Sequence, residues 1–268
     1  MVTGETPSIF LAMPLGSEQG HVASLQGFFQ LASQRYARLA TVRVGSALSH
    51  NFNALWSTAL GTKEITHFAM LHSDLVPPVW WLDALYDEMQ LSGASLVSSV
   101  NAIKDRKGLT STAVGDPEDP WDYRRITTTE LQGLPTTFGI EDIPESITEG
   151  FRTTLLVNTG CWLADIRDPV WRERDDEGRL KFFFTQNDRI SYDDKEDRYV
   201  AEFAPEDWLF SRTCAEHGIK VCATTAIKNS HIGSHGYQTG YAWGDLLTDT
   251  EAVQFHETKP LSKERLLS

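Results

Sequence analysis

The segment Thr66-His-Phe-Ala-Met-Leu-His-Ser-Asp-Leu-Val-Pro-Pro-Val-Trp-Trp-Leu-Asp83 contains a strand end, a polar triplet and a chain break in immediate succession. The apolar run at residues 67–71 predicts a buried strand, and two prolines then break the chain before the next helix. His72, Ser73 and Asp74 therefore follow the carboxyl end of a strand, where α/β sheets bind their ligands. His72 and Asp74 share one side of an extended chain because they are two residues apart. This placement predicts a site that holds a divalent cation and, through it, a diphosphate.

Strands and helices alternate on both sides of this segment. Apolar runs predict strands at residues 8–13, 39–44 and 94–100. Apolar residues at three- and four-residue spacing predict helices at 22–36, 51–60 and 79–89. The alternation predicts an α/β fold with a mostly parallel, Rossmann-like central sheet flanked by helices.

The second half of the chain is less regular. We expect loops with short elements at 101–150, a strand at 153–164 interrupted by Asn158-Thr159-Gly160, and an inserted hairpin or loop at 172–200. A helix at 205–217, which opens with Pro205 and ends before Gly218, and a strand at 219–227 should follow, with His231 in a polar turn after them. No repeat or low-complexity linker divides the chain, so we expect a single domain over residues 1–268. Its parts would be a nucleotide-sugar-binding half (8–100), an acceptor half (101–235) and a C-terminal extension (236–268).

Composition indicates a globular protein of enzyme size. Hydrophobic residues make up 41% of the 268, with 8 Trp and 13 Phe. The net charge of −13 argues against binding to nucleic acid by bulk electrostatics. Cys161, Cys214 and Cys222 lack the spacing of a zinc site or a disulfide framework, which fits a reduced cytoplasm. Without a signal-peptide pattern or a transmembrane run, we expect a cytoplasmic protein with no membrane partner.

Several candidate site residues also have a structural interpretation. Asp74 either binds a metal or caps the following helix. His72 either ligates that metal, contacts phosphate through water or packs, and His231 is either a ligand or a solvated loop residue. Glu206 and Asp207 open a helix, where acids compensate the helix dipole; alternatively, one of them is a general base.

Two further groups of polar residues have no single interpretation from the sequence. Asn158 and Gly160 mark either a β-bulge or a contact to substrate. Five basic residues gather in the loop-rich middle of the chain and keep nucleic acid open as an acceptor only: Lys104, Arg106, Lys107, Arg124 and Arg125.

In this order, the motifs resemble glycosyltransferases of the GT-A fold, in the large inverting family of bacterial and phage sugar transferases. The resemblance covers most of residues 8–235 and implies a GT-A-like sheet with a loop-rich acceptor side. Residues 14–18 resemble the loop that cups the nucleotide base, and residues 52–61 resemble a family helix, with Phe52 in place of an arginine. His72-Ser73-Asp74 stands where the family has Asp-any-Asp, and Glu206-Asp207 stands where it has its base.

The resemblance implies a hexosyltransferase that moves a sugar from a nucleotide diphosphate, most often of UDP type, to a hydroxyl of a glycan, a small molecule or a modified DNA base. It implies Mn²⁺ or Mg²⁺ held by Asp74, His231 and His72, with Asp207 and its neighbour Glu206 as catalytic residues. The donor would be bound by Pro14, Leu15, Gly16, Glu18, Asn53, His72, Ser73, Asn158 and Gly160. Two alternatives remain open, a sugar-phosphate nucleotidyltransferase and a non-catalytic module that binds nucleotide or sugar.

Overall fold

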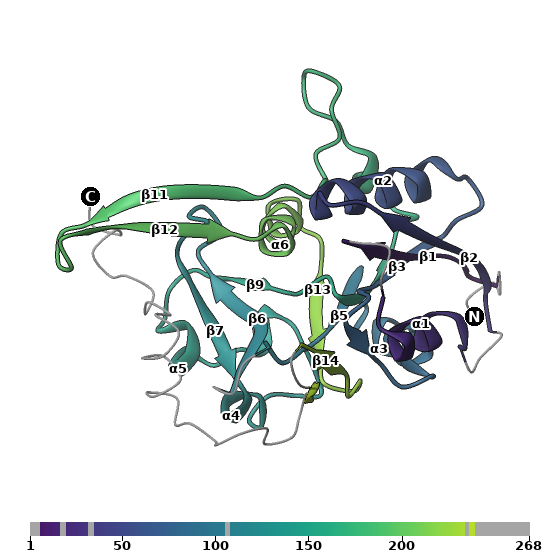
Figure 1. Cartoon of the computed structure of the whole chain (residues 1–268), viewed down its shortest axis with the longest axis horizontal. Coiled ribbons are helices and arrows are strands. Elements are labelled where there is room, and N and C mark those ends of the chain that lie inside the picture. The colour runs from purple at the N-terminus through teal and green to yellow at the C-terminus, as the bar shows by residue number, and fades with distance from the viewer. Residues whose placement is uncertain (1–5, 17–19, 32–34, 105–107, 234–235, 239–268) are drawn as a thin grey trace.

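The computed structural model describes residues 6–16, 20–31, 35–104, 108–233 and 236–238. It is an α/β protein with a large mixed sheet of seven strands flanked by helices (Figure 1). In spatial order the strands are β2 (Ala37–Val44), β1 (Ser8–Leu15), β3 (His67–Leu71), β10 (Cys161–Asp165), β5 (Leu96–Ser99), β13 (Val221–Thr224) and β8 (Thr137–Phe138).

The sheet is mixed, so the expectation of a mostly parallel sheet is wrong. β1 pairs in parallel with β2 and β3, and β5 pairs in parallel with β13. β10 lies antiparallel between β3 and β5, and β8 is antiparallel to β13. The chain enters β10 from β9 (Thr154–Leu156), a strand of a different sheet, through residues 158–160. Apolar periodicity identifies a buried strand but carries no information about its direction.

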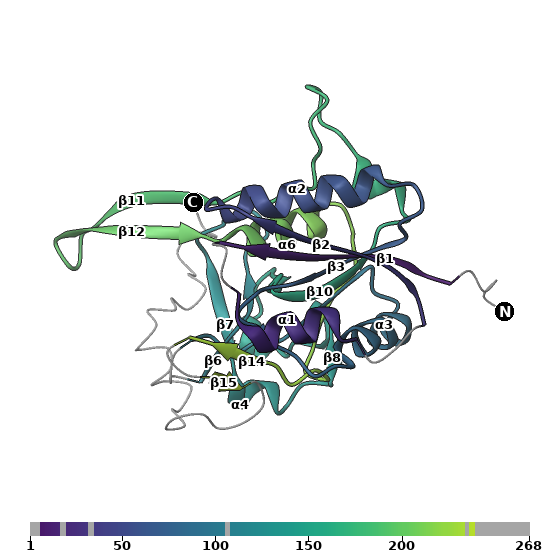
Figure 2. The same ribbon diagram turned by 45° about the vertical axis from the view of Figure 1, so that its right-hand side comes forward.

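Helices cover both faces of the sheet (Figure 2). α1 (Val22–Phe29) and α3 (Trp81–Ser92) pack on one face, and α2 (Leu48–Gly61) and α6 (Glu206–Glu216) pack on the other. Alternate residues of β1 divide between the two cores: Ile9, Leu11 and Met13 face α1 and α3, whereas Phe10 and Ala12 face α2. This two-sided burial explains why the strand is a continuous apolar run.

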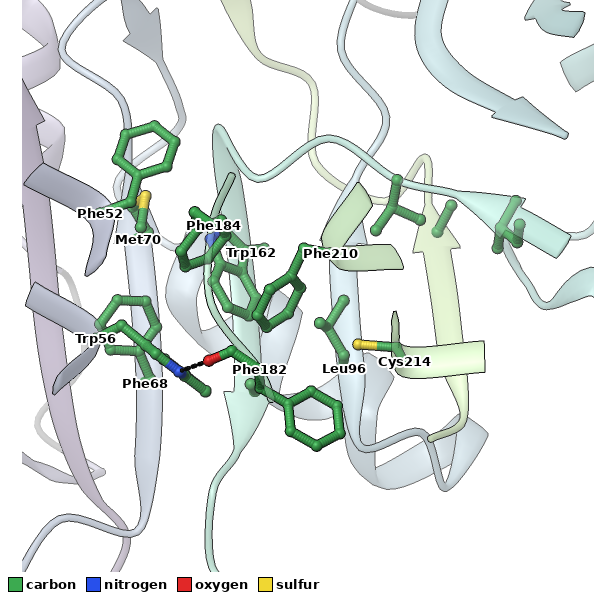
Figure 3. Packing of buried hydrophobic residues seen from close by; sticks show 14 of the residues in the cluster. Phe52, Trp56, Phe68, Met70, Leu96, Trp162, Phe182, Phe184, Phe210 and Cys214 are labelled. Carbon is green, nitrogen blue, oxygen red and sulfur yellow. Dashed lines mark hydrogen bonds between the residues drawn. The ribbon is translucent and has the colours of Figure 1, made fainter. Parts of the chain in front are cut away.

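An aromatic cluster forms the core under α2 and α6 (Figure 3). The rings of Phe184 and Phe210 stack with their centroids 4.5 Å apart. The indole Nε1 of Trp56 donates a hydrogen bond to the carbonyl oxygen of Phe182 at 2.9 Å. Phe182 and Phe184 are buried while Phe183 is 48% exposed, so the aromatic triplet anchors an extended segment by its alternate residues.

Three smaller sheets complete the structure. The first has the order β7-β6-β9, with β6 at Leu109–Gly115 and β7 at Tyr123–Thr127. The second has the order β15-β14-β4, with β4 at Leu75–Val76, β14 at Ser230–Ile232 and β15 at Gly236–Gln238. The third is the hairpin of β11 (Asn187–Asp193) and β12 (Arg198–Ala204). The loop-rich region 101–150 contains β6, β7 and β8 with the short helices α4 (Thr128–Leu131) and α5 (Glu145–Thr148).

Two local predictions need correction. His231, expected in a polar turn, lies in β14, because residues 230–231 pair with β4. The helix expected to reach residue 36 ends at Phe29, and Tyr36 is buried with its hydroxyl donating to Asp83 at 2.9 Å. The helix predicted at 205–217 is confirmed as α6, with Gly218 after its end at a φ of 68°.

No helix in the described part of the chain is long and apolar enough to cross a bilayer. The three cysteines are buried and free, so none of them forms a disulfide.

We expect Phe210→Ala to destabilise the protein by about 3–5 kcal/mol, because it removes a ring that is fully enclosed in the aromatic cluster. Urea unfolding followed by circular dichroism measures the change. Leu91→Ala is the control, since Leu91 is 81% exposed and its loss should change the free energy of unfolding by no more than about 0.5 kcal/mol. Equal losses in the two variants would contradict this view of the core.

Candidate active site

The His72-Ser73-Asp74 triplet forms the turn between β3 and β4. The backbone N–H of His72 donates to the carbonyl oxygen of Gly160 at 2.7 Å, and that of Leu75 donates to the carbonyl oxygen of His72 at 3.2 Å. The first bond joins the triplet to the chain just before β10. The triplet is therefore held between two strands of the large sheet at their common edge.

β14 brings His231 to Asp74. It pairs with β4, and the N–H of Ile232 donates to the carbonyl oxygen of Asp74 at 2.7 Å. The His231 ring bonds the carbonyl oxygen of Ala102 through Nδ1 at 2.8 Å, so Nδ1 carries a proton. Its Nε2 then faces Asp74, 3.5 Å from Oδ2.

Lys104 provides a cation at the same carboxylate. Its Nζ contacts Oδ2 of Asp74. Burial raises the pKa of Asp74, but His231, His72 and Lys104 lower it by more, so this pKa lies well below its usual range. Asp74 is therefore an ionised carboxylate in a partly buried, positively charged setting.

The three residues expected to bind a metal lie in one neighbourhood, yet they do not fit Mn²⁺ or Mg²⁺ as placed. No group of three or more His, Cys, Asp or Glu side chains in the described ranges is arranged to hold a metal ion. Lys104 contacts the Asp74 oxygen that a metal would need. Burial lowers the pKa of His72, whose Nε2 is enclosed without a hydrogen-bond partner and whose ring packs 5.0 Å from that of Phe52.

The second part of the site is the N-terminus of α6. Glu206 and Asp207 are 8% and 7% exposed, so neither is a solvated acid at a helix end. Glu206 accepts a hydrogen bond from Gln186 at 2.9 Å, and Asp207 accepts one from Asn158 at 3.0 Å. Both carboxylates are therefore held by amides from other parts of the chain.

Asp207 has a strongly altered pKa. Burial raises it, and the neighbouring charge of Glu206 raises it further. The N–H of Trp208, the charge of Arg125 and the amide of Asn158 partly oppose this, and the pKa of Asp207 is raised to about 7. A carboxylate with that pKa can accept and return a proton near neutral pH.

Asn158 links the two parts of the site. Its Oδ1 accepts hydrogen bonds from the N–H of Gly160 at 2.7 Å and from Nδ2 of Asn101 at 3.0 Å, while its Nδ2 reaches Asp207. Asn101 in turn accepts from Asn229 at 2.7 Å. A Cβ on Gly160 would lie 2.5 Å from Oδ1 of Asn158 and 2.7 Å from the Leu75 side chain, so a larger residue here would displace the Asn158 amide or Leu75.

The remaining predicted donor contacts lie at the ends of β1 and β3. Pro14 and Leu15 are the last residues of β1, Gly16 follows in open space, and the carbonyl oxygen of Ser73 accepts from the N–H of His21 at 3.2 Å. Glu18 is outside the described residues. Asn53 is placed differently: its amide exchanges two hydrogen bonds of 2.7 Å with the backbone of Phe184.

Sequence reasoning missed several residues of this region. Asn51, not Asn53, joins the loops after β1 and β2, because its Nδ2 donates to the carbonyl oxygens of Gly45 at 2.7 Å and Leu15 at 3.2 Å. Lys104 was expected on the acceptor side and not at Asp74. Asn101 had a usable signal, since it follows a predicted strand directly; Asn229 had none.

The basic residues of the loop-rich middle are engaged inside the molecule where the structure describes them. Arg124 contacts Glu130, and Arg125 donates to the carbonyl oxygen of Thr110 at 3.0 Å and lies over the Trp208 ring. Arg106 and Lys107 lie outside the described residues.

Comparison with known proteins gives distant structural likeness without a sequence match. No family model matches the chain, and no curated protein matches it. Among solved structures, the chain is similar to A197 from STIV with a TM-score of 0.48 and 10% sequence identity, over 85% of this chain and 86% of that chain.

The raised pKa of Asp207 predicts a pH-dependent stability. A buried acid whose pKa is about 7 when folded and about 3.9 when unfolded stabilises the fold fully below about pH 4 and loses that contribution as the pH rises to about 7. The free energy of unfolding of the wild type, relative to Asp207→Asn, should therefore fall between these pH values and stay constant above about pH 8. Urea titrations across the range measure it. Asp176→Asn, at an exposed position, should show no such trend, and a flat difference for Asp207→Asn would contradict the assignment.

Proposed function

We propose that this protein is a glycosyltransferase that moves a sugar from a nucleotide-diphosphate donor of UDP type to a hydroxyl acceptor, with inversion at the anomeric carbon. The observation that carries the proposal is Asp207, a buried carboxylate with a pKa of about 7 that Asn158 holds within the same hydrogen-bonded chain as the β3 strand end. General bases are tuned toward the working pH in this way.

Asp207 would act as the base of a single displacement. Its carboxylate accepts the proton of the acceptor hydroxyl while the hydroxyl oxygen forms a bond to the anomeric carbon. The bond from that carbon to the diphosphate breaks, and its electron pair leaves with the phosphate oxygen. The rigid start of α6 after Pro205 supports this role, because it fixes the position of the carboxylate.

Lys104 would stabilise the leaving diphosphate. Its ammonium group is at the β3 strand end, where the sequence motif predicts the phosphates. To bind a phosphate oxygen, Lys104 would give up its contact with Asp74. His231 lies at the same place, and its Nε2 can donate a hydrogen bond to a phosphate oxygen when the ring is protonated, whereas burial disfavours the charged form of His72. Because the residues as placed do not fit Mn²⁺ or Mg²⁺, no step of the proposed reaction depends on a metal.

The nucleotide would lie at the end of β1. Asn51 ties together the backbone at Leu15 and Gly45, and Gly16 faces open space. The acceptor would approach from the β7-β6-β9 sheet, which packs against α6 through Trp208. Glycans and small molecules suit that side better than DNA, because Arg124 and Arg125 make internal contacts.

The first test separates donor binding from chemistry. Thermal-shift measurements with UDP, GDP, CDP and dTDP identify the donor base, since a ligand that binds only the folded state raises the melting temperature. Asp207→Asn should keep that shift, while hydrolysis or transfer of the matching nucleotide sugar falls by about 10²–10⁴. Glu206→Gln should reduce this turnover less than Asp207→Asn does. Full turnover in Asp207→Asn, or retained anomeric configuration by proton NMR, would refute the role of Asp207; no shift with any nucleotide would refute the donor class.

The second test concerns Lys104. Lys104→Met should weaken nucleotide-diphosphate binding in the presence of EDTA by roughly 10- to 100-fold, the value of a charge-assisted hydrogen bond. Lys63→Met, an exposed lysine in the turn before β3, should bind as the wild type does. If Lys104→Met binds normally and all binding requires manganese, the diphosphate is held by a metal on Asp74, His231 and His72 instead.

A further inference from the structure

The β11–β12 hairpin is a two-stranded ribbon that extends away from the rest of the molecule (Figures 1 and 2). Its register pairs Asn187 with Ala204 and Asp193 with Arg198. Side chains alternate between the two faces of such a ribbon. One face, here called the outer face, consists of Asp188, Ile190, Tyr192, Tyr199, Ala201 and Phe203.

The opposite, inner face is polar and is anchored to the body of the protein. The Arg189 guanidinium lies 4.4 Å over the Trp121 ring, and its Nε donates to Glu202 at 2.6 Å. Trp121 belongs to the turn between β6 and β7, which Arg212 of α6 holds through the carbonyl oxygens of Asp116 at 2.8 Å and Asp119 at 3.1 Å. These contacts fix which face of the ribbon turns toward the body.

The outer face is apolar and exposed along its whole length. Ile190 is 75% exposed, Tyr199 77%, Tyr192 48% and Phe203 47%. A sheet with one solvated face normally places its apolar side chains against the core and its polar ones in water. The polarity is inverted in this hairpin, and an isolated two-stranded ribbon is at best marginally stable in water. Both facts point to a surface that another apolar layer covers.

We propose that the outer face is an interface with a second copy of this chain, whose own hairpin supplies the covering layer. Two identical ribbons match in length, twist and chemistry, and a two-fold axis would place each outer face on the other. An enclosed aromatic side chain buries about 150–250 Å², so the exposed parts of these four large side chains amount to about 500 Å² per copy. The pair of faces would then bury about 1,000 Å², which is the size at which specific interfaces begin.

The distribution of charge agrees with a second copy and disfavours nucleic acid. The outer face carries one charged residue, Asp188, and no cation, so it offers nothing to a phosphate backbone. The chain has a net charge of −13, and two bodies in direct contact would repel each other. A projecting arm keeps the bodies apart, and at physiological salt the repulsion is screened over about 8 Å.

Sedimentation velocity and light scattering over a range of concentrations test the proposal. The wild type should form a dimer of twice the chain mass, and raising the salt concentration should strengthen it. The double variant Ile190→Asp with Tyr199→Asp should raise the dissociation constant by at least about 30-fold, since each change places a charge at the centre of the interface. Its melting temperature at low protein concentration should match that of the wild type, because both side chains are exposed.

Leu91→Asp is the matched control, since Leu91 is 81% exposed but lies on α3. It should form dimers as the wild type does. A wild type that stays monomeric at every concentration would overturn the proposal and leave another protein, or residues 239–268 of the same chain, to cover the face. A dimer that Leu91→Asp and the hairpin variant weaken equally would also overturn it. Neither result bears on the proposed transferase activity, which nucleotide binding and Asp207→Asn test separately.

Discussion

The hydrogen bonds of the Asn158 side chain are the interaction on which the candidate site depends. Asn158 lies where the chain leaves β9 of one sheet and enters β10 of another, and its amide reaches Asp207, Asn101 and Gly160 at once. Gly160 in turn accepts from the N–H of His72. Three elements far apart in the sequence, β3, β5 and α6, are therefore held at one point. Asn158 is partly buried, whereas Asp207, Asn101 and Gly160 are buried. The three hydrogen bonds restrict the position of the amide, because leaving a buried partner unpaired costs about 1–3 kcal/mol.

Asp74 and Asp207 differ in charge state because different charged groups surround them. Burial raises the pKa of both Asp74 and Asp207. At Asp74 the nearby His231, His72 and Lys104 outweigh burial, whereas at Asp207 the charge of Glu206 adds to it. One carboxylate is thus ionised at any physiological pH and the other is poised near neutrality. Pairs of acids separated in this way commonly divide the tasks of holding charge and moving a proton.

The projecting hairpin is connected to the site through the core. Before β11 the chain is held by Phe182 and Phe184 in the aromatic cluster and by the two hydrogen bonds between Asn53 and Phe184. After β12 the chain enters α6 directly, and Phe210 of α6 stacks on Phe184. Both ends of the arm therefore adjoin α6, the helix that carries Glu206 and Asp207. A second copy bound to the outer face would therefore contact a ribbon whose base adjoins α6, the proposed catalytic helix.

The sequence by itself determined the α/β class, most strands and helices of the first 100 residues, the strand end at His72-Ser73-Asp74, and the helix that opens with Glu206 and Asp207. These follow from local periodicity, prolines and glycines, which act over a few residues. Only the tertiary structure decided that β10 runs antiparallel, that His231 reaches Asp74 through a β14–β4 pairing, that Lys104 takes the carboxylate expected to bind a metal, and that Asn51 instead of Asn53 holds the β1 loop. Strand direction and the choice of partner strand depend on contacts between residues that are distant in the chain. Burial and neighbouring charges set the protonation state of each acid. Local sequence periodicity contains no information about either of these.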